Sequence, residues 1–438
     1  MKNADWFFDL VANNVGSIAE ELRKYQSSIG IPWVIAKDVN KWWIKDFPSE
    51  DLVHDTALAA IDGGGRFVDL AGGGALYIAR AIAVFNSGIK PLRKLTIDIV
   101  NYRSKKYMDA LRSLTEILVA IDTIEHLPEG SILLIDGSYY VYVLKYFARA
   151  IKLLKNIETL RSGEIRLLEK TLKLITSLIN LIKKARDKDI TLCYVSKDSS
   201  LNLFKELLIL EYFKELNPKI YELLIRIDYK QHLDVLAKLK NSLDIEQQKL
   251  IDLLLEEDYH DIHLIMSIVD DIGYTKPMKP SLRKALVNRI LDTLEKPKIM
   301  HKLDEYKSKY GLDSGIIEYI RRGMGYLTTS ILSYTKLSIN DNPLMIEVIE
   351  LTNIGQSIIN HTKPIFTEHT NGFIKALATI KKGYVNNRYY NIWLVQAHEY
   401  SHLTRNTFRY YLNYLDSTLR TRGLRIPLTR KYSLGGIH

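Results

Sequence analysis

The stretch at residues 57–65 reads Ala-Leu-Ala-Ala-Ile-Asp-Gly-Gly-Gly, and it decides the fold together with residues 131–138, Ser-Ile-Leu-Leu-Ile-Asp-Gly-Ser. Both begin as short apolar runs, which are typical of buried strands, and both lead into an aspartate followed by glycine. Glycine lets the chain turn and leaves the carboxylates of Asp62 and Asp136 exposed at the edge of a sheet. The two side chains can meet if their strands are neighbours. The other interpretation is a pair of ordinary turns, because Asp-Gly is a common turn dipeptide.

The segments between these two runs predict an α/β fold. Strand-like residues at 66–70, 75–84 and 94–100 are separated by clusters of glycine, which favours an antiparallel meander. Residues 104–127 then carry apolar side chains at helical spacing. A group of antiparallel strands, a helix and a further strand, with acidic residues at the end of the first strand, on the helix and at the end of the last strand, follow the order of the ribonuclease-H-like fold. We therefore expect a ribonuclease-H-like mixed sheet core.

Long helical insertions are expected in this core. Apolar periodicity predicts a helical pair over 140–187, broken at Ser162-Gly163, and helices over most of 203–330. The other expected elements are strands at 190–195, 327–337 and 345–351 and helices at 4–26, 366–380 and 391–420.

Composition narrows the class of protein. The 438 residues carry a net charge of +10, which favours a polyanionic partner. The charge alone does not distinguish such a protein from a basic protein without a nucleic-acid role. Cys193 is the single cysteine, so the chain can form no intramolecular disulfide and no cysteine-based zinc or iron–sulfur site. No apolar run reaches about 18 residues, so no membrane span is expected. Asp5 and Asp9 interrupt any signal-like apolar core, and we expect a cytoplasmic protein.

A third carboxylate is expected to join Asp62 and Asp136. Hydrolysis of phosphodiesters with two metal ions needs several carboxylates around cations about 4 Å apart. Glu116 lies on the predicted helix between the two strands, 20 residues before Asp136. Periodicity alone leaves it open whether Glu116 is a solvated surface residue. The same helix also carries three competing acidic residues, Asp109, Asp122 and Glu125.

Four motifs resemble those of the archaeal NurA nucleases and follow in the family's order. Residues 59–66 and 133–138 are similar to its two strand-Asp-Gly motifs, residues 194–198 to its strand ending in Ser-Lys, and residues 390–399 to its C-terminal segment with Ala-His-Glu. Gly64 stands where the first motif usually has serine. Asn391 and Trp393 stand where the last motif has prolines.

The resemblance implies a Mn²⁺-dependent 5′-to-3′ DNA exonuclease that also cuts single-stranded DNA as an endonuclease, with a two-metal site and Mg²⁺ as the alternative metal. It implies action on single- and double-stranded DNA ends during end resection in recombinational repair. The implied partners are a second copy of the chain and a HerA-type hexameric translocase.

Individual roles carry over by motif. The resemblance implies that Asp62, Glu116 and Asp136 are metal ligands, and that His398 is a fourth ligand or a proton-transfer group. It also implies that Lys197 and Tyr390 position or neutralise the scissile phosphate.

The same resemblance implies a division of the chain. Residues 56–410 would form the nuclease domain, with helical insertions at about 140–188 and 203–325. Residues 1–55 would form an N-terminal helix and connector, and residues 411–438 a basic C-terminal tail.

Other functions compete with this interpretation. His398-Glu399-Tyr400-Ser401-His402 matches the H-E-x-x-H pattern of zinc metalloproteases. No glutamate follows Glu399, and Arg405 and Phe408 stand where a metzincin has glycine and histidine. Residues 256–263, with two histidines among acidic residues, are compatible with an HD-type phosphohydrolase or with a solvated helix face. A non-catalytic DNA-binding or assembly factor is the third alternative.

Overall fold

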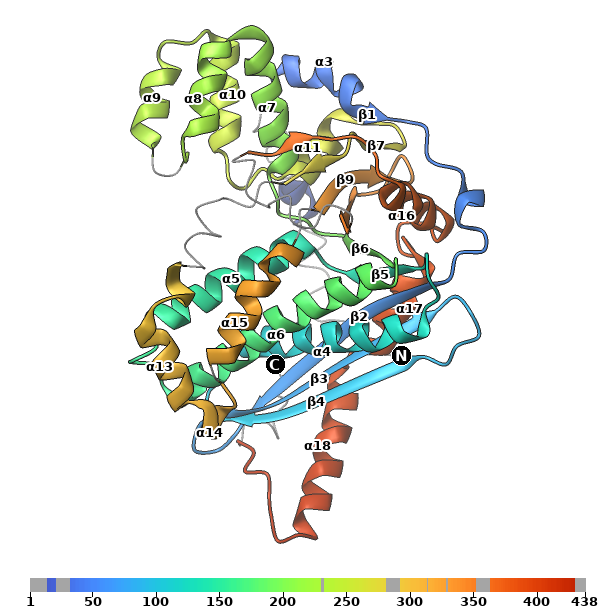
Figure 1. Cartoon of the computed structure of the whole chain (residues 1–438). Coiled ribbons are helices and arrows are strands. Elements are labelled where there is room, and N and C mark those ends of the chain that lie inside the picture. The colour runs from blue at the N-terminus through green and yellow to red at the C-terminus, as the bar shows by residue number, and fades with distance from the viewer. Residues whose placement is uncertain are drawn as a thin grey trace. The chain divides into compact units, whose positions relative to one another are not determined.

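The computed structural model describes residues 14–20, 32–229, 232–280, 292–312, 314–327, 330–351 and 363–429. The chain divides into two compact units, Met1–Trp42 with Ser200–Val269, and Trp43–Ser199 with Asp270–His438. We call them unit 1 and unit 2. The mixture of a large sheet and many helices confirms the predicted α/β class (Figure 1). Within the described part of the chain, no helix is sufficiently long and apolar to span a membrane.

Unit 2 contains one mixed sheet. Its main path runs β1-β7-β9-β10-β6-β5-β2-β3-β4, and β8 pairs with both β9 and β11. The strands are β1 (Trp43–Ile44), β2 (Leu58–Asp69), β3 (Ala75–Phe85), β4 (Leu92–Val100), β5 (Ile132–Asp136), β6 (Thr191–Ser196), β7 (Gly273–Thr275), β8 (Met278–Lys279), β9 (Ser330–Lys336), β10 (Leu344–Ile349) and β11 (Ile365–Phe366).

The centre of the sheet places the two Asp-Gly strands side by side. β2 pairs in parallel with β5, and Ile61 lies opposite Ile135. β5 in turn pairs in parallel with β6. Parallel neighbours end at the same edge of a sheet, so the residues that follow Ile61 and Ile135 lie close together. The meander β2-β3-β4 is antiparallel, as expected.

The glycine triplet Gly63–Gly65 does not turn the chain, contrary to the expectation. β2 continues through it as one strand, with Gly63 opposite Ala81 and Gly65 opposite Ala79. A Cβ atom on Gly64 would lie 2.3 Å from the carbonyl oxygen of Ser401. The glycine triplet therefore allows neighbouring elements to pack close to the backbone of β2. Gly137, after Asp136, does adopt a positive φ of 118° and turns the chain as predicted.

Helices cover both faces of this sheet. α4 (Lys105–His126) packs on β2, β3 and β4, and α6 (Ser162–Asp187) packs on α4 (Figure 1). α17 (Ile392–Ser401) packs on β2 and β3. The other helical elements of unit 2 are η1 (Glu50–Val53), α5 (Tyr139–Lys155), α13 (Pro297–Glu305), α14 (Lys307–Tyr310), α15 (Ser314–Gly323), η2 (Met324–Tyr326), α16 (Asn371–Lys382) and α18 (Arg405–Arg420).

Two apolar clusters among the described residues stabilise unit 2. One joins β2, β5, β6 and β10 to α16 and α17, and it includes Cys193, which is fully buried in the middle of β6. The other joins β2 and β3 to α18 through Phe408 and Leu412. Burial of this apolar surface is the main stabilising term for the sheet and its helices.

The described part of unit 1 is helical, as expected for much of 203–330. It contains α3 (Trp33–Trp42), α7 (Leu203–Leu216), α8 (Pro218–Arg226), α9 (Leu233–Lys240), α10 (Ile245–Leu255) and α11 (Asp261–Ile268). The buried carboxylate of Asp261 accepts hydrogen bonds from the backbone N–H groups of Phe204 and Lys205 at the start of α7. The buried ammonium of Lys205 donates to the carbonyls of Glu256 and Tyr259. Burial lowers the pKa of Lys205.

Two expectations differ from the structure or lie outside it. The interruption near Gly273 and Pro277 contains the short strands β7 and β8, which join the sheet through β9. A local pattern of two or three residues cannot reveal such a pairing. Most of the helix expected at 4–26 lies outside the described residues. Of this segment the structure describes residues 14–20, and residues 15–20 are helical.

Candidate metal centre

Three of the predicted site residues converge at the edge of the sheet. Asp62, Asp136 and His398 each offer one ligand atom, and these atoms all lie within 4.8 Å of one another. Asp62 lies within β2, Asp136 ends β5, and His398 belongs to α17. Two carboxylates and an imidazole form a donor set that suits Mn²⁺ or Mg²⁺ more than a soft metal.

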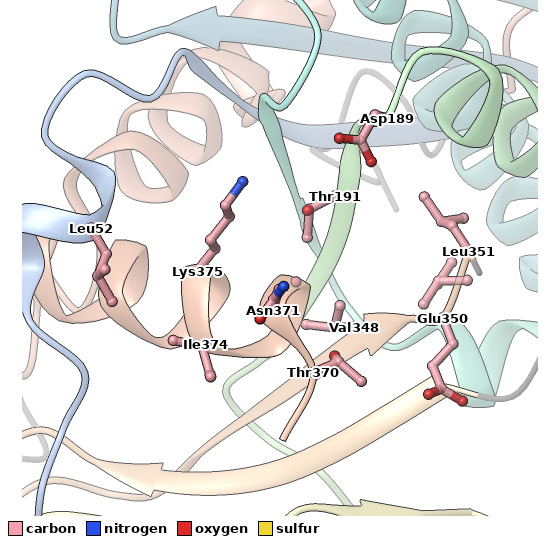
Figure 2. Close-up of a pocket in the computed structure, with 12 residues that line it drawn as sticks. Leu52, Asp189, Thr191, Val348, Glu350, Leu351, Thr370, Asn371, Ile374 and Lys375 are labelled. Carbon is pink, nitrogen blue, oxygen red and sulfur yellow. The ribbon is translucent and has the colours of Figure 1, made fainter. Parts of the chain in front are cut away.

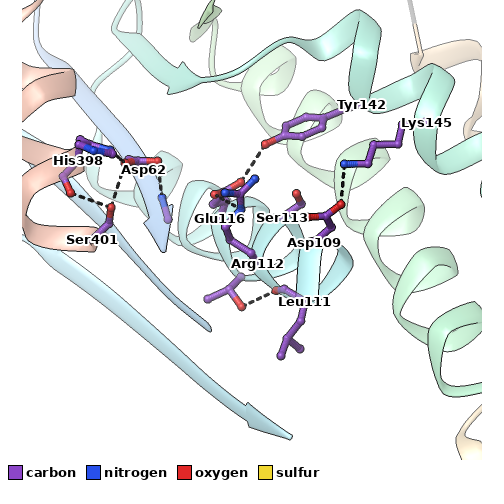
Figure 3. A network of polar contacts seen from close by, with 12 residues as sticks. Asp62, Asp109, Leu111, Arg112, Ser113, Glu116, Tyr142, Lys145, His398 and Ser401 are labelled. Atoms are coloured by element: carbon purple, nitrogen blue, oxygen red, sulfur yellow. Dashed lines mark hydrogen bonds and ion pairs between the residues drawn. The ribbon is translucent and has the colours of Figure 1, made fainter. Parts of the chain in front are cut away.

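Asp62 is held by contacts from both sides (Figure 3). His398 Nδ1 lies 2.7 Å from Asp62 Oδ2, and the hydroxyl of Ser401 donates to the same oxygen at 2.9 Å. The backbone N–H of Gly63 donates to Asp62 Oδ1 at 2.7 Å. Neutral donors and a histidine thus fix the orientation of this carboxylate.

Glu116 lies beside these three residues, although it is not part of the group within 4.8 Å. A Cβ atom on Gly63 would lie 2.5 Å from both Cγ and Oε1 of Glu116, so the glutamate packs directly against β2. Tyr142 donates a hydrogen bond to Glu116 Oε2 at 2.9 Å, and Arg112 Nε lies 3.6 Å from Oε1 (Figure 3). Glu116 is buried, so it is not the solvated surface residue that the sequence left open as an alternative.

The negative charges of this cluster are not fully compensated. Burial raises the pKa of Glu116 to about 7; the cation of Arg112 opposes this shift, and the charges of Asp62 and Asp136 add to it. Burial also raises the pKa of Asp136, against the opposing effect of Lys197. Added cations would relieve both effects, since an opposite charge nearby favours the ionised carboxylate. The residues present therefore fit divalent metal ions.

The three competing acids of α4 point to other partners. Asp109 pairs with Lys145 at 3.0 Å, Asp122 pairs with Lys94 at 2.7 Å, and Glu125 pairs with Lys184. Among these four acids, Glu116 is the one that packs against Gly63, the residue after Asp62, and its pKa is raised by burial and by the charge of Asp62.

Lys197 and Tyr390 lie at the same edge of the sheet. Lys197 follows β6, and its Nζ lies 3.3 Å from Asp136 Oδ2 and 4.7 Å from the centre of the Tyr390 ring. Burial and the nearby carboxylates Asp136 and Asp62 raise the pKa of Tyr390, so its hydroxyl keeps its proton. Within the described residues, this buried hydroxyl has no hydrogen-bond partner.

Glu347 supports the site and was missed by the sequence analysis. It is fully buried in β10, where Oε2 accepts from the hydroxyl of Ser138 at 2.8 Å and Oε1 accepts from the N–H of Tyr140 at 2.9 Å. It therefore anchors the turn after Asp136 at the start of α5. The available signal was a lone glutamate inside the apolar run Leu344–Ile349, because a buried carboxylate needs dedicated partners.

Arg80 was also missed. Arg80 Nε donates to the carbonyl of Ser401 at 2.7 Å, and its NH2 group donates to the carbonyl of His402. A guanidinium that binds the last carbonyls of α17 fixes the helix that carries His398. Nothing in the sequence near Arg80 indicates this partner, more than 300 residues away.

The alternative metal patterns do not assemble in this way. α17 ends at Ser401, and His402 follows it with extended backbone, so the helix of an H-E-x-x-H site is not complete. Among the described residues, the metal-competent group contains His398 but neither Glu399 nor His402. In unit 1, His260 and His263 stack on each other with ring centres 5.7 Å apart, and no metal-competent group is found at this pair.

A larger cavity of about 670 Å³ lies elsewhere in unit 2. It is lined by Thr191, Asn371, Lys375 and Glu350, among others (Figure 2). Thr191 begins β6, whereas Lys197 follows the end of that strand. None of the predicted site residues lines this cavity.

The sheet order and its covering helices define an α/β protein with the fold of the NurA nucleases. The crystal structure of the NurA nuclease from Sulfolobus solfataricus matches 96% of this chain and 98% of its own, with 14% sequence identity and a TM-score of 0.51. This match confirms, at the level of the fold, the resemblance inferred from the motifs.

Two further NurA crystal structures match less closely. One, bound to dAMP and manganese, covers 97% of this chain and 99% of its own, with 16% identity and a TM-score of 0.38. One with manganese covers 92% of this chain and 98% of its own, with 16% identity and a TM-score of 0.37. No protein-family model and no curated protein matches the sequence.

Proposed function

We propose that this chain is a metal-dependent DNA nuclease of the NurA type. The observation that carries the proposal is the meeting of Asp62, Asp136 and His398, whose ligand atoms lie within 4.8 Å of one another although the residues are up to 336 positions apart. The buried Glu116 beside them supplies a third carboxylate. The shared fold supports the same proposal.

We further propose that the core is ribonuclease-H-like. The strand order β4-β3-β2-β5-β6, with β2 parallel to β5 and antiparallel to β3, supports this. The nuclease domain would span residues 56–410, with residues 1–55 and 411–438 as the flanking segments.

The proposed ligands are Asp62, Glu116, Asp136 and His398, holding two Mn²⁺ or Mg²⁺ ions. Such ions would stabilise the charge that develops during phosphodiester hydrolysis. His398 is the residue that would alternatively move a proton, because its Nδ1 is oriented by Asp62.

Lys197 and Tyr390 would act on the phosphate itself. The ammonium of Lys197 would neutralise a phosphate oxygen, and the Tyr390 hydroxyl, which lacks a partner among the described residues, would donate a hydrogen bond to it. The ammonium of Lys197 lies 4.7 Å from the centre of the Tyr390 ring, so one phosphate could contact both residues.

The finer activity follows the NurA resemblance. We propose 5′-to-3′ exonuclease and single-strand endonuclease activity on DNA ends, in resection for recombinational repair. A homodimer working with a HerA-type hexameric translocase in the cytoplasm is part of this proposal. The net charge of +10 is consistent with a polyanionic substrate.

The test is cleavage of end-labelled single- and double-stranded DNA with Mn²⁺, with Mg²⁺ or with chelator. Asp62→Ala and Asp136→Ala are expected to reduce cleavage to the level seen with chelator while DNA binding is retained. Asp122→Asn, an exposed acid of α4, is the matched control and should cleave normally. A wild-type chain that binds DNA but never cuts it would indicate the assembly-factor alternative.

A second pair of variants tests the protease alternative. His398→Ala should lose DNA cleavage, whereas His402→Ala should keep it, because His402 is not in the group of Asp62, Asp136 and His398 and contacts His398 only ring to ring, with centres 5.9 Å apart. Equal losses in both variants, together with zinc-dependent peptide hydrolysis, would contradict the nuclease proposal.

A further inference from the structure

Side-chain contacts join α4 to α5 and lead away from the metal centre. Beside the centre, the hydroxyl of Tyr142, near the start of α5, donates to Glu116 of α4. Farther along α5, Lys145 Nζ lies 3.0 Å from Oδ2 of Asp109, which precedes Glu116 on α4 (Figure 3). The two helices therefore run in opposite directions where their side chains meet.

Four cationic side chains line this contact. The side chain of Arg112 is 44% exposed and that of Lys145 is 37% exposed. Lys105 and Lys152 are exposed as well. Within each helix the two cations are seven residues apart, so they lie on one face of it. We call these four residues, Lys105, Arg112, Lys145 and Lys152, the basic seam.

The basic seam carries an excess of positive charge. Asp109 pairs with Lys145 and offsets one of the four charges. At the other end of α4 there is no such excess in the printed contacts of its acids, because each of the two acids there is paired with a lysine. A positive surface of this kind attracts a polyanion.

Arg112 is the member of the basic seam that lies against the metal centre. Its Nε atom is 3.6 Å from Glu116 Oε1, which makes an ion pair but is too long for a hydrogen bond. Almost half of its side chain is open to solvent. A guanidinium in this position can donate two parallel hydrogen bonds to a phosphate group.

The basic seam is long enough for several phosphates. Lys105 and Glu116 are eleven residues apart on α4, which corresponds to a helical rise of about 16 Å. One strand of B-form DNA carries a phosphate about every 3.4 Å along its axis. The seam therefore suits the backbone of a strand more than a single free anion. Its continuity with the metal centre favours a nucleic-acid strand over an acidic protein segment.

We propose that the basic seam binds the sugar–phosphate backbone of the DNA strand on one side of the scissile phosphate. Arg112 makes the contact next to the metal centre, and Lys145, Lys105 and Lys152 make the more distant ones. The inference rests on the proposed nuclease function. It adds residues that lie outside all four motifs on which the family resemblance depends.

The salt dependence of DNA binding tests the basic seam. Fluorescence anisotropy of a labelled single-stranded oligonucleotide is measured with the full chain and chelator at several salt concentrations. Each phosphate contact contributes about 0.7 to the slope of log affinity against log salt concentration for single strands. Arg112→Gln combined with Lys145→Gln should therefore lower the slope by about 1.4. Lys145→Gln alone alters an exposed residue and should lower it by about 0.7.

Lys94→Gln combined with Lys184→Gln is the matched control. The control removes the same charge and, like the test pair, leaves two acids of α4 without their cations. The side chains of Lys94 and Lys184 are 34% and 37% exposed, close to the exposure of Lys145. This variant should keep the wild-type slope. Equal decreases in the two double variants would show an effect of net charge alone and would overturn the basic seam.

The basic seam and the nuclease proposal can fail independently, because binding is measured with chelator. A wild-type chain that does not bind the oligonucleotide overturns the seam. An unchanged slope in both test variants also overturns it, in favour of an acidic protein segment, even if DNA is cleaved with Mn²⁺. A slope that depends on Arg112 and Lys145 in a chain that never cleaves DNA would support the seam and overturn the nuclease.

Discussion

The absence of a side chain at Gly63 determines where Glu116 can lie. Its backbone is extended, so the residue is not required for a turn. Its Cα hydrogen instead leaves room for Glu116, whose Oε1 would lie 2.5 Å from a Cβ atom at this position. The glycine after Asp62 is thus the reason that a carboxylate from α4 can reach a carboxylate of β2.

Gly63→Ala is expected to displace Glu116 and to abolish metal-dependent cleavage. The added methyl group overlaps the glutamate, and overpacking of this kind costs about 1–3 kcal/mol. Cleavage rates and the Mn²⁺ affinity from calorimetry measure the effect. Gly88→Ala is the control, because its Cβ would meet nothing within 4 Å. A Gly63→Ala protein with wild-type affinity for Mn²⁺ would show that Glu116 is not needed at the site.

At the scale of the element, β10 fixes the position of α5. Glu347 reaches from the buried strand to the first residues of the helix, where it accepts from Ser138 and Tyr140. It also accepts from Ser330 on the neighbouring strand β9. A carboxylate at a helix N-terminus is favoured by the helix dipole. The turn that follows Asp136 is therefore held by a buried carboxylate of β10.

Glu347→Ala is expected to destabilise the protein by about 3 kcal/mol, because it leaves several buried donors without an acceptor. Ser330→Ala removes one of the same contacts and should cost about 1 kcal/mol. Urea denaturation of both variants gives the two values. Equal losses would mean that the carboxylate contributes no more than one ordinary hydrogen bond.

Across the whole molecule, the sequence predicted those elements that a local pattern of apolar residues specifies. The helix expected at 104–127 is α4, Lys105–His126, and the break at Ser162-Gly163 falls at the start of α6. The proximity of Asp62 and Asp136 followed from two similar strands. The pairing of β6 with β10 brings together residues about 150 positions apart, and no local pattern specifies it. The sequence analysis did not identify Arg80 and Tyr142 for the same reason, because tertiary packing determines which residues they contact.

The stability of the metal-free molecule should fall as the pH rises from 5 to 8. Burial is the largest cause that raises the pKa of Glu116 to about 7, compared with about 4.3 in an unfolded chain. The folded state thus binds this proton more tightly. The resulting stability is fully present below the unfolded pKa and is lost as the pH rises through about 7.

Urea denaturation with chelator at several pH values measures this effect. Between pH 5 and 8 the wild-type chain should lose up to about 3 kcal/mol more than Glu116→Gln, which has no proton to release. Asp136 and Glu347 also have raised pKa values, so the effect of Glu116 is taken from the difference between the two proteins and not from the wild-type curve alone. Parallel curves for the two proteins would contradict the raised pKa of Glu116.

The single cysteine gives the molecule a built-in reporter. Cys193 lies in β6 between Leu134 of β5 and Val348 of β10, and burial raises the pKa of its thiol. A thiol-specific reagent can react with it only after the apolar cluster that joins β6 to α16 and α17 has opened, since the thiolate is the reactive form and needs access. The labelling rate of the unmodified chain therefore times the opening of the core beneath the strands that lead to Asp136 and Lys197, with no engineered probe.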